Sequence, residues 1–296
     1  MSSRQERGGL RDRWRPRETG RGLRVVPPGE RRRPADAGAA PAPSAARQAT
    51  GTPCWLSLTT RDVRAAERFY GRVLGWCHVP LLGSPGRARS LLLKDGAPVG
   101  TISGTTRDLG VHAGWLPYFA VGDVDDAVAR LHERGATVAV GPLSGDAGRV
   151  AVVAGPEDAV FGVRQQAPDA RWTVGEGPVA RLELCTRDVF AAALFYGGVL
   201  GWGSGRPGCC AVEYVDERIV VRDGPRTAAV LRGGTAPGTG GRHRWHACFR
   251  VADVDAALAA ALAEGGRVIT PPVGPRHRRQ AVLTDREGIP FTVVAD

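Results

Sequence analysis

The sequence predicts an α+β protein made of two tandem copies of one domain. Each copy is a pair of βαβββ modules whose strands form a curved sheet around a cup. A run containing Thr-Arg-Asp-Val, Phe-Tyr-Gly and Val-Leu-Gly-Trp occurs at 60–76 and again at 186–202. The motif Val-x-Asp-Val-Asp also occurs twice, at 121–125 and 251–255. Solenoid units repeat every 20–50 residues or so, so this longer repeat indicates a duplicated domain. The 296 residues suffice for about two domains with cores of their own.

The first module begins with a half-buried strand at 55–59, where apolar and polar residues alternate. Asp62 stands where a helix N-cap belongs, and Gly75 ends the predicted helix. The hairpin dipeptide Asp95-Gly96 then joins the last two strands of the module. The three strands after the helix are expected near 76–82, 88–93 and 98–102.

The second module repeats this order, with a strand from 115 and a helix from Asp123. Its last three strands are expected near 136–140, 149–154 and 160–163. In the second copy, helices begin at Asp188 and Asp253 in the same context. The chain is therefore divided into a tail at 1–50, a first domain at 51–167, a linker at 168–178 and a second domain at 179–296.

The net charge of +10 lies mostly in the first 50 residues, which hold 12 arginines and 5 acids. This segment is rich in Arg, Pro, Gly and Ala, so we predict a disordered tail, which a start at Val25 or Val26 would shorten. An arginine-rich arm can bind phosphate without sequence specificity. However, 39 of the 40 basic residues are arginine, a property of the whole chain, so nucleic-acid binding is not expected.

No apolar run approaches the about 18 residues that a transmembrane helix needs, so no membrane association is expected. The N-terminus lacks the apolar segment of a secretory signal, which favours a cytoplasmic location. The six cysteines show no Cys-x-x-Cys spacing, and reduced, mostly buried thiols are expected.

Three motifs of the first domain identify a family. They are Leu58-x-x-x-Asp62 followed by Phe69-Tyr70-x-x-Val73-Leu74-Gly75-Trp76, then Val121-x-Asp123-Val124-Asp125, then Gly155-Pro156-Glu157-Asp158-x-x-Phe161. Together they resemble the vicinal oxygen chelate (VOC) superfamily, which includes glyoxalases, extradiol dioxygenases and bleomycin-resistance proteins. The opening at 51–55 is similar to the tandem glyoxalase-like subgroup often labelled hydroxylase. The resemblance covers 51–296 and implies a fold rather than one reaction.

The resemblance also implies positions for divalent-metal ligands on the concave face of each sheet. These positions fall at Trp55, Leu116 and Gly162 in the first domain and at Arg181, His246 and Thr292 in the second. Only His246 can hold a metal. The superfamily's metal-dependent reactions need a Lewis acid, so no cofactor is expected. A divalent metal stays an alternative if the partner domain contributes ligands.

Strand alternation predicts which residues line the first cup. The helix-facing set is Leu56, Leu58, Phe119, Val121, Phe161 and Val163. The cup-facing set is Trp55, Ser57, Thr59, Leu116, Tyr118, Ala120, Gly162 and Arg164. This mostly apolar basin suits a flat, partly polar organic ligand, which Trp55, Ser57, Tyr118 and Arg164 would bind. In the alternative, Trp55 and Tyr118 simply fill the cavity or pack against the other domain.

The second cup is predicted to be ionic. The helix-facing set is Leu182, Leu184, Phe249, Val251, Phe291 and Val293. The cup-facing set is Arg181, Glu183, Cys185, His246, Cys248, Arg250 and Thr292. In one interpretation Glu183 orients His246 as a catalytic general base, while Arg181 or Arg250 binds an anionic group. In the other, the charges form a structural cluster, in which Arg181 pairs with Glu183 and Arg250 with Glu213.

The sequence therefore predicts a tandem glyoxalase/bleomycin-resistance/dioxygenase-like protein that binds a small organic molecule in a metal-free cup. It would either sequester that molecule or act on it by acid–base chemistry. The alternative is a metal-dependent lyase or dioxygenase of the VOC superfamily with an unrecognised ligand set. A third hypothesis is an interaction protein whose cups are both plugged. A monomer and a homodimer are both compatible with a duplicated chain.

Overall fold

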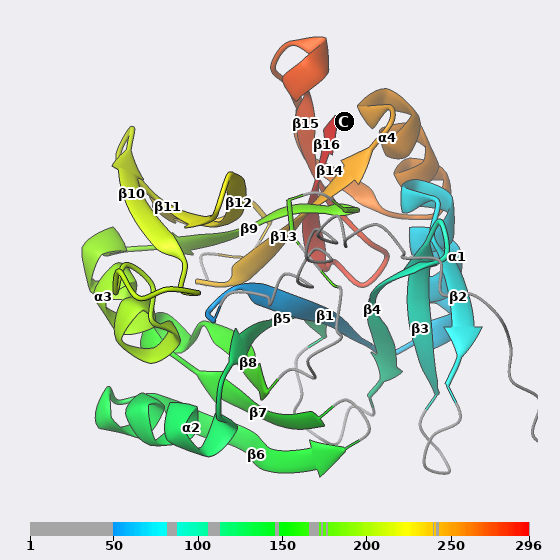
Figure 1. Ribbon diagram of the computed structural model, residues 1–296. Coiled ribbons are helices and arrows are strands. Elements are labelled where there is room, and N and C mark those ends of the chain that lie inside the picture. The colour runs from blue at the N-terminus through cyan, green and yellow to red at the C-terminus, as the bar shows by residue number, and fades with distance from the viewer. Residues whose placement is uncertain are drawn as a thin grey trace, which may run out of the picture. The chain divides into compact units, whose positions relative to one another are not determined.

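The computed structural model describes residues 50–81, 88–105, 113–145, 148–165, 172, 174–175, 177–238, 240 and 243–295. The predicted tail up to residue 49, with Val25 and Val26, lies outside these ranges. Each of the two copies forms an eight-stranded mixed sheet (Figure 1). The predicted α+β fold with two tandem domains is therefore confirmed.

The first sheet has the strand order β2-β3-β4-β1-β5-β8-β7-β6. Its strands are β1 (Pro53–Thr60), β2 (Cys77–Pro80), β3 (Arg89–Lys94), β4 (Ala97–Gly104), β5 (Gly114–Val121), β6 (Thr137–Gly145), β7 (Gly148–Ala154) and β8 (Val160–Gln165). Within each module the first and last strands are parallel, β1 with β4 and β5 with β8. The two modules join through the antiparallel pair β1 and β5, which places both modules in one sheet.

The second sheet repeats this order as β10-β11-β12-β9-β13-β16-β15-β14. Its strands are β9 (Val179–Thr186), β10 (Ala211–Val215), β11 (Arg218–Asp223), β12 (Arg226–Gly233), β13 (Trp245–Val251), β14 (Arg267–Val273), β15 (Gln280–Thr284) and β16 (Pro290–Ala295). Short 3₁₀ turns lie at η2 (Pro156–Asp158) and η3 (Arg276–Arg278). The duplication seen in the sequence is thus a duplication of topology.

The helices begin at the predicted aspartates. They are α1 (Val63–Leu74), α2 (Val124–Glu133), α3 (Val189–Leu200) and α4 (Val254–Ala263). Each preceding aspartate accepts a hydrogen bond from a backbone N–H of the first turn, such as Ala65 N to Asp62 Oδ1 at 2.9 Å. This bond satisfies a donor that has no partner within the helix. Gly75 and Gly201 end α1 and α3 at positive φ, which glycine adopts without strain.

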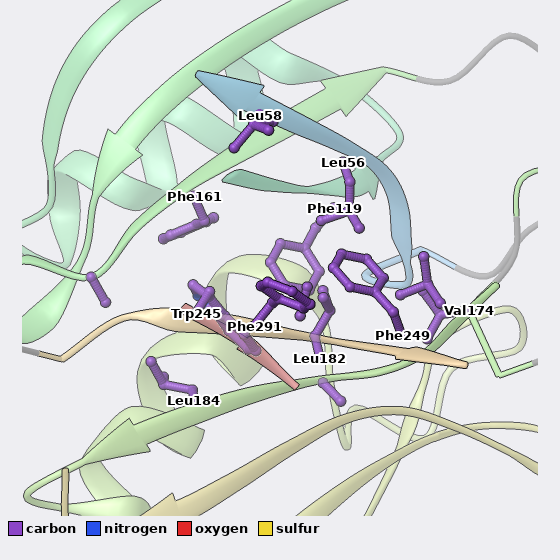
Figure 2. Packing of buried hydrophobic residues seen from close by; sticks show 14 of the residues in the cluster. Leu56, Leu58, Phe119, Phe161, Val174, Leu182, Leu184, Trp245, Phe249 and Phe291 are labelled. Atoms are coloured by element: carbon purple, nitrogen blue, oxygen red, sulfur yellow. The ribbon is translucent and has the colours of Figure 1, made fainter. Parts of the chain in front are cut away.

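Side chains of both sheets meet in one hydrophobic core (Figure 2). Phe119 of β5 lies with its ring centroid 5.1 Å from that of Trp245 of β13, and both rings are buried. Sequence length predicted a core for each domain. The buried faces of the two sheets instead share one core, because each offers an apolar surface that the other covers.

The first helix of each domain packs against the other domain. Phe69 on α1 contacts Phe291 of β16 with ring centroids 6.0 Å apart, and Phe195 on α3 contacts Phe161 of β8 at 6.4 Å. α1 and α4 also lie side by side (Figure 1). Burying one such ring contributes about 1.5–3 kcal/mol, so these contacts couple the stability of the two domains.

Two glutamates bind the strand ends of the opposite domain. Glu287 accepts a hydrogen bond from the Thr60 hydroxyl at 2.6 Å and another from the next backbone N–H at 2.9 Å. Glu157 does the same with Thr186, at 2.8 Å and 3.1 Å. Thr60 and Thr186 end strands β1 and β9, three residues before the first residues of α1 and α3. Each domain therefore fixes the point at which the other domain's first helix begins.

The cysteines and the helices agree with two predictions from the sequence. All six cysteines are free thiols, and Cys54, Cys185, Cys210 and Cys248 are buried, as predicted. Over the described residues, the four helices are all too short or too polar to cross a bilayer.

Candidate ligand-binding site

The face of each sheet that points away from the shared core carries the residues predicted to line the cups. All twelve residues predicted to face the helices lie in the hydrophobic core and are at most 9% exposed. Trp55, Ser57, Tyr118 and Arg164, on the opposite parity, are half-buried. The predicted in-and-out alternation is confirmed. We call these surfaces the first outer face, around Trp55 and Tyr118, and the second outer face, around Glu183 and His246.

Trp55 is the largest side chain of the first outer face. Its ring centroid lies 6.4 Å from that of Trp172, a residue of the predicted linker. The guanidinium carbon of Arg164 lies 5.4 Å from the Trp55 centroid, within cation–π range. Trp172 is held in place because its indole N–H donates a 2.6 Å hydrogen bond to the Val99 carbonyl. The face thus presents an indole with a second indole at its side and a cation above it.

Two hydroxyl groups lie beside this indole. The Trp55 indole N–H donates to Thr101 Oγ1 at 3.4 Å, and Thr101 donates to Ser57 Oγ at 3.4 Å. Bonds of this length are weak, so a polar group of a ligand could replace them at little cost. Burial raises the pKa of Tyr118, although Arg164 opposes the shift, so this phenol is a neutral hydrogen-bond donor.

Tyr118 takes up the space where the VOC resemblance places a metal ligand. A Cβ atom on Gly162 would lie 2.1 Å from Cδ1 of the Tyr118 ring, far closer than van der Waals contact. The two residues are paired on the parallel strands β5 and β8. Glycine at this position therefore lets the aromatic ring lie flat across the sheet, and no acidic side chain fits there.

The second outer face is held together by ion pairs. Arg181 Nε donates to Glu183 Oε1 at 2.7 Å, and Arg232 Nε lies 3.5 Å from the other carboxylate oxygen. Arg181 also donates to Gln280 Oε1 at 3.1 Å. Burial alone would raise the pKa of Glu183, but the two guanidinium groups hold it below its ordinary value. Glu183 is therefore ionised, and the predicted structural pair of Arg181 with Glu183 is formed.

His246 lies at the centre of this face and is 5% exposed. Its Nε2 shares a 2.7 Å hydrogen bond with Thr292 Oγ1. Burial lowers the pKa of His246 to about 4, although Glu183 favours the charged form, so the imidazole is neutral at pH 7. Burial also raises the pKa of the neighbouring Cys248, which stays a thiol. Neither group is accessible to a substrate in this arrangement.

The predicted dyad is not joined directly. His246 and Glu183 are opposite each other on β13 and β9, yet no hydrogen bond or ion pair links them in the part of the chain that the structure describes. The predicted pairing of Arg250 with Glu213 is also wrong, because Glu213 accepts from Arg222 at 3.0 Å. Arg250 instead donates to the backbone carbonyl groups of Gly175 and Gly177 in the linker. The catalytic roles of His246 and Glu183 stay predictions.

The donor set does not fit a divalent metal on either face. On the first, the implied ligand positions hold an indole, an isobutyl group and glycine. On the second, a metal at His246 would meet the cationic side chain of Arg181, and Thr292 already occupies Nε2. Among the described residues, no three His, Cys, Asp or Glu side chains gather around one point. A metal would need at least three such ligands.

Two residues of these faces were not predicted from the sequence. Trp172 lies in the linker, where no strand period assigns a side to it. Arg232 is on β12, paired with Cys185 of β9, so its parity could have been derived had the register of the two strands been known. Both depend on contacts between residues far apart in the chain.

Comparison with known proteins identifies the family. The family model described as a glyoxalase-like domain matches twice, at residues 55–164 and 181–294. The anthracycline biosynthesis protein DauV of a Streptomyces species is 31% identical over 267 residues, covering 84% of this chain and 94% of that protein. The putative glyoxylase CFP32 of Mycobacterium tuberculosis is 32% identical over 260 residues, covering 82% and 94%.

Solved structures show the same fold at low identity. A Mn(II)-bound glyoxalase from Novosphingobium aromaticivorans has a TM-score of 0.55 at 16% identity and covers 83% of this chain and 82% of its own. The 2,3-dioxygenase LapB from a Pseudomonas species has a TM-score of 0.55 at 14% identity, with 85% and 94% covered. The duplicated match and the shared fold make this chain a tandem member of the glyoxalase-like domain family, within the vicinal oxygen chelate superfamily.

Proposed function

We propose that this protein binds a flat, partly polar organic molecule on the first outer face, without a metal ion. The observation that carries the proposal is the arrangement of Trp55, with Arg164 5.4 Å from its ring centroid and Trp172 beside it. An indole offers a large apolar surface for stacking. A guanidinium group can both stack on a planar ligand and bind its anionic oxygen.

The polar neighbours of Trp55 suit a substituted aromatic ring system. Ser57 and Thr101 present hydroxyl groups, and Tyr118 presents a protonated phenol. Two relatives, DauV and DnrV, are named anthracycline biosynthesis proteins. Anthracyclines are fused-ring aromatic compounds with hydroxyl and carbonyl substituents. We therefore propose a fused-ring aromatic of this general kind as the ligand class.

Binding, rather than acid–base catalysis, is the role that the side chains support. His246 has a pKa of about 4 and is 5% exposed, so it is a weak and inaccessible base at neutral pH. Glu183 is occupied by Arg181 and Arg232. The described residues of the first outer face, Trp55, Ser57, Tyr118 and Arg164, include no comparable base. Because these side chains can bind a ligand but offer it no accessible base, the proposed role is to sequester or deliver the ligand.

Calorimetric titration with anthraquinone carboxylate tests the proposal. Full-length protein treated with EDTA is expected to show saturable binding. Trp55→Ala should weaken it by about tenfold, or about 1.4 kcal/mol, because stacking area is lost. Trp55→Phe is the matched control and should retain most of the affinity. Arg164→Gln should weaken binding of the carboxylate but not that of neutral anthraquinone.

Two results would overturn this proposal. One is the absence of saturable binding, or equal binding by Trp55→Ala. The other is binding that appears only after Mn²⁺ is added, which would support the alternative of a metal-dependent lyase or dioxygenase.

A further inference from the structure

The second domain exposes a group of large apolar side chains on α3 and the neighbouring strand β10. Phe190 and Leu194 of α3 are 60% and 77% exposed, and Val212 and Tyr214 of β10 are 37% and 58% exposed. The rings of Phe190 and Tyr214 lie 5.4 Å apart. Phe190 and Leu194 are one helical turn apart, and Val212 and Tyr214 share one side of their strand. We call these four residues the apolar patch.

The first domain shows that the fold does not require this patch. In the duplicated copy, Arg64 corresponds to Phe190 and Arg68 corresponds to Leu194, and both arginines are exposed. α3 contains no charged residue at all. The same helix surface is therefore solvated in one domain and apolar in the other. Contiguous exposed apolar surface of this kind is typical of a site of association.

The strand beside this helix also has a free edge. β10 is the terminal strand of the second sheet, and within the described chain it pairs only with β11. All five of its residues are exposed. Figure 1 shows β10 above α3 at the left of the view, and the rings of Tyr214 and Phe190 join the two elements. An unpaired edge next to apolar side chains favours the addition of another strand.

We infer that the apolar patch and the β10 edge form the interface between two copies of this chain. Antiparallel pairing of β10 with its own copy is generated by a two-fold axis, the commonest symmetry of protein oligomers. The same axis would bring the two patches together. The four side chains of the apolar patch are uncharged, and the carboxylate of Glu213 on β10 is paired with Arg222 of its own chain, so a second copy is a suitable occupant.

The surface area that two copies would bury at this interface agrees with the area expected for a dimer. Taking about 150–250 Å² for each aromatic side chain, the exposed fractions give roughly 400 Å² of apolar surface in each copy. Two copies would bury roughly 800 Å² of side chain, and the paired strand edges bring the total near the roughly 1,000 Å² of a specific interface. The chain's own residues 1–49 are a poor alternative cover, because they carry 12 arginines.

Sedimentation velocity of the full-length protein over about 1–100 µM tests this inference. The wild type is expected to form a dimer with twice the monomer mass of 31.2 kDa. The double variant Phe190→Arg, Leu194→Arg copies the arginines of α1 and should raise the dissociation constant by about tenfold or more. Tyr214→Arg, which alters β10 rather than α3, should act in the same direction. At concentrations well below the dissociation constant of the dimer, thermal melts should be unchanged, since all three residues are exposed.

Leu262→Arg is the matched control, since Leu262 is a 56% exposed leucine on α4, outside the patch. It should leave the dimer intact. A wild type that stays monomeric at about 100 µM, whether or not residues 1–49 cover the patch, overturns the inference. A dimer that survives both the double variant and Tyr214→Arg overturns it as well, because the interface would then lie elsewhere.

Discussion

The carboxylate of Glu287 accepts a 2.6 Å hydrogen bond from the hydroxyl of Thr60, 227 positions earlier in the chain. The same carboxylate accepts from the backbone N–H groups of Arg61 and Asp62, just before α1. A negative charge at this point also favours the positive end of the helix dipole. Glu157 repeats the arrangement before α3. The two domains are therefore bound reciprocally at equivalent points.

Glu287→Ala should destabilise the protein by about 1–3 kcal/mol, because it leaves the Thr60 hydroxyl and two N–H groups without their acceptor. Urea denaturation measures the change in free energy of unfolding. Asp125→Ala is the control, since it removes an exposed pair with Arg149 within one domain and should change stability little. Equal losses of stability in the two variants would show that the interdomain hydrogen bonds of Glu287 contribute no more than an exposed ion pair.

Asp285 should make stability depend on pH. Burial raises the pKa of Asp285 to about 6, although N–H groups of Ile289 and Glu287 and the Tyr70 hydroxyl oppose the shift. The folded state then binds a proton that the unfolded chain loses near pH 4, so this contribution is complete below about pH 4 and is lost as pH rises through 6.

Asp285→Asn removes that ionisation. Relative to the wild type, the variant should gain up to about 3 kcal/mol of stability between pH 4 and pH 7. Chemical denaturation at both pH values measures the difference. A difference that is the same at pH 4 and pH 7 would show that Asp285 titrates normally.

The carboxylates of Glu157 and Glu287 should act in the opposite direction. Partial burial opposes ionisation, but hydrogen bonds from Thr186 and Thr60 and their arginine neighbours hold both pKa values below the ordinary range. Their stabilisation is present above the unfolded pKa and is lost as pH falls through the lower folded values. Glu157→Gln should therefore flatten the loss of stability below about pH 4, as followed by acid titration of circular dichroism.

Gly162→Ala should destabilise the protein by about 1–3 kcal/mol, because the new methyl group would overlap the Tyr118 ring. The double-mutant cycle with Tyr118→Ala isolates this contact. In the Tyr118→Ala background, Gly162→Ala should leave the free energy of unfolding almost unchanged. An equal loss of stability in both backgrounds would show that the added methyl group overlaps another part of the sheet rather than the Tyr118 ring.

Arg181→Leu should destabilise the protein by about 3–5 kcal/mol, because it removes the shorter ion pair of the largely buried Glu183 and leaves the 3.5 Å pair with Arg232. Replacing both residues by leucine should restore much of the loss, since an apolar pair of similar volume needs no solvation. Thermal and urea unfolding of the two variants give the comparison. A double variant as unstable as the single one would indicate that Glu183 has another role.

Mn²⁺ should not stabilise the EDTA-treated protein, because over the residues that the structure describes no three His, Cys, Asp or Glu side chains gather at one point. A metal present at 100 times its dissociation constant would add about 2.7 kcal/mol, which a thermal shift detects readily. Stabilisation by Mn²⁺ that His246→Ala abolishes would contradict the proposed metal-free site.

Local sequence determined most of the secondary structure. Asp62, Asp123, Asp188 and Asp253 were identified as N-caps because a short acceptor before an apolar helical period has one common use. The alternation around Trp55 and His246 gave the correct side of each strand, because side chains of a strand alternate strictly between faces. These features depend on residues a few positions apart, and so the sequence was sufficient.

Only the tertiary structure decided which groups meet. The period of helix α1 places Phe69 in a core and the period of strand β16 places Phe291 in one, but the packing of the two sheets makes it a shared core. Trp172 reaches Trp55 from an irregular segment. The register of β9 and β13 places His246 opposite Glu183. However, Glu183 accepts its hydrogen bond from Arg181, and His246 shares its hydrogen bond with Thr292. Such contacts join residues up to 227 positions apart, and their energies depend on how whole sheets pack rather than on any local pattern.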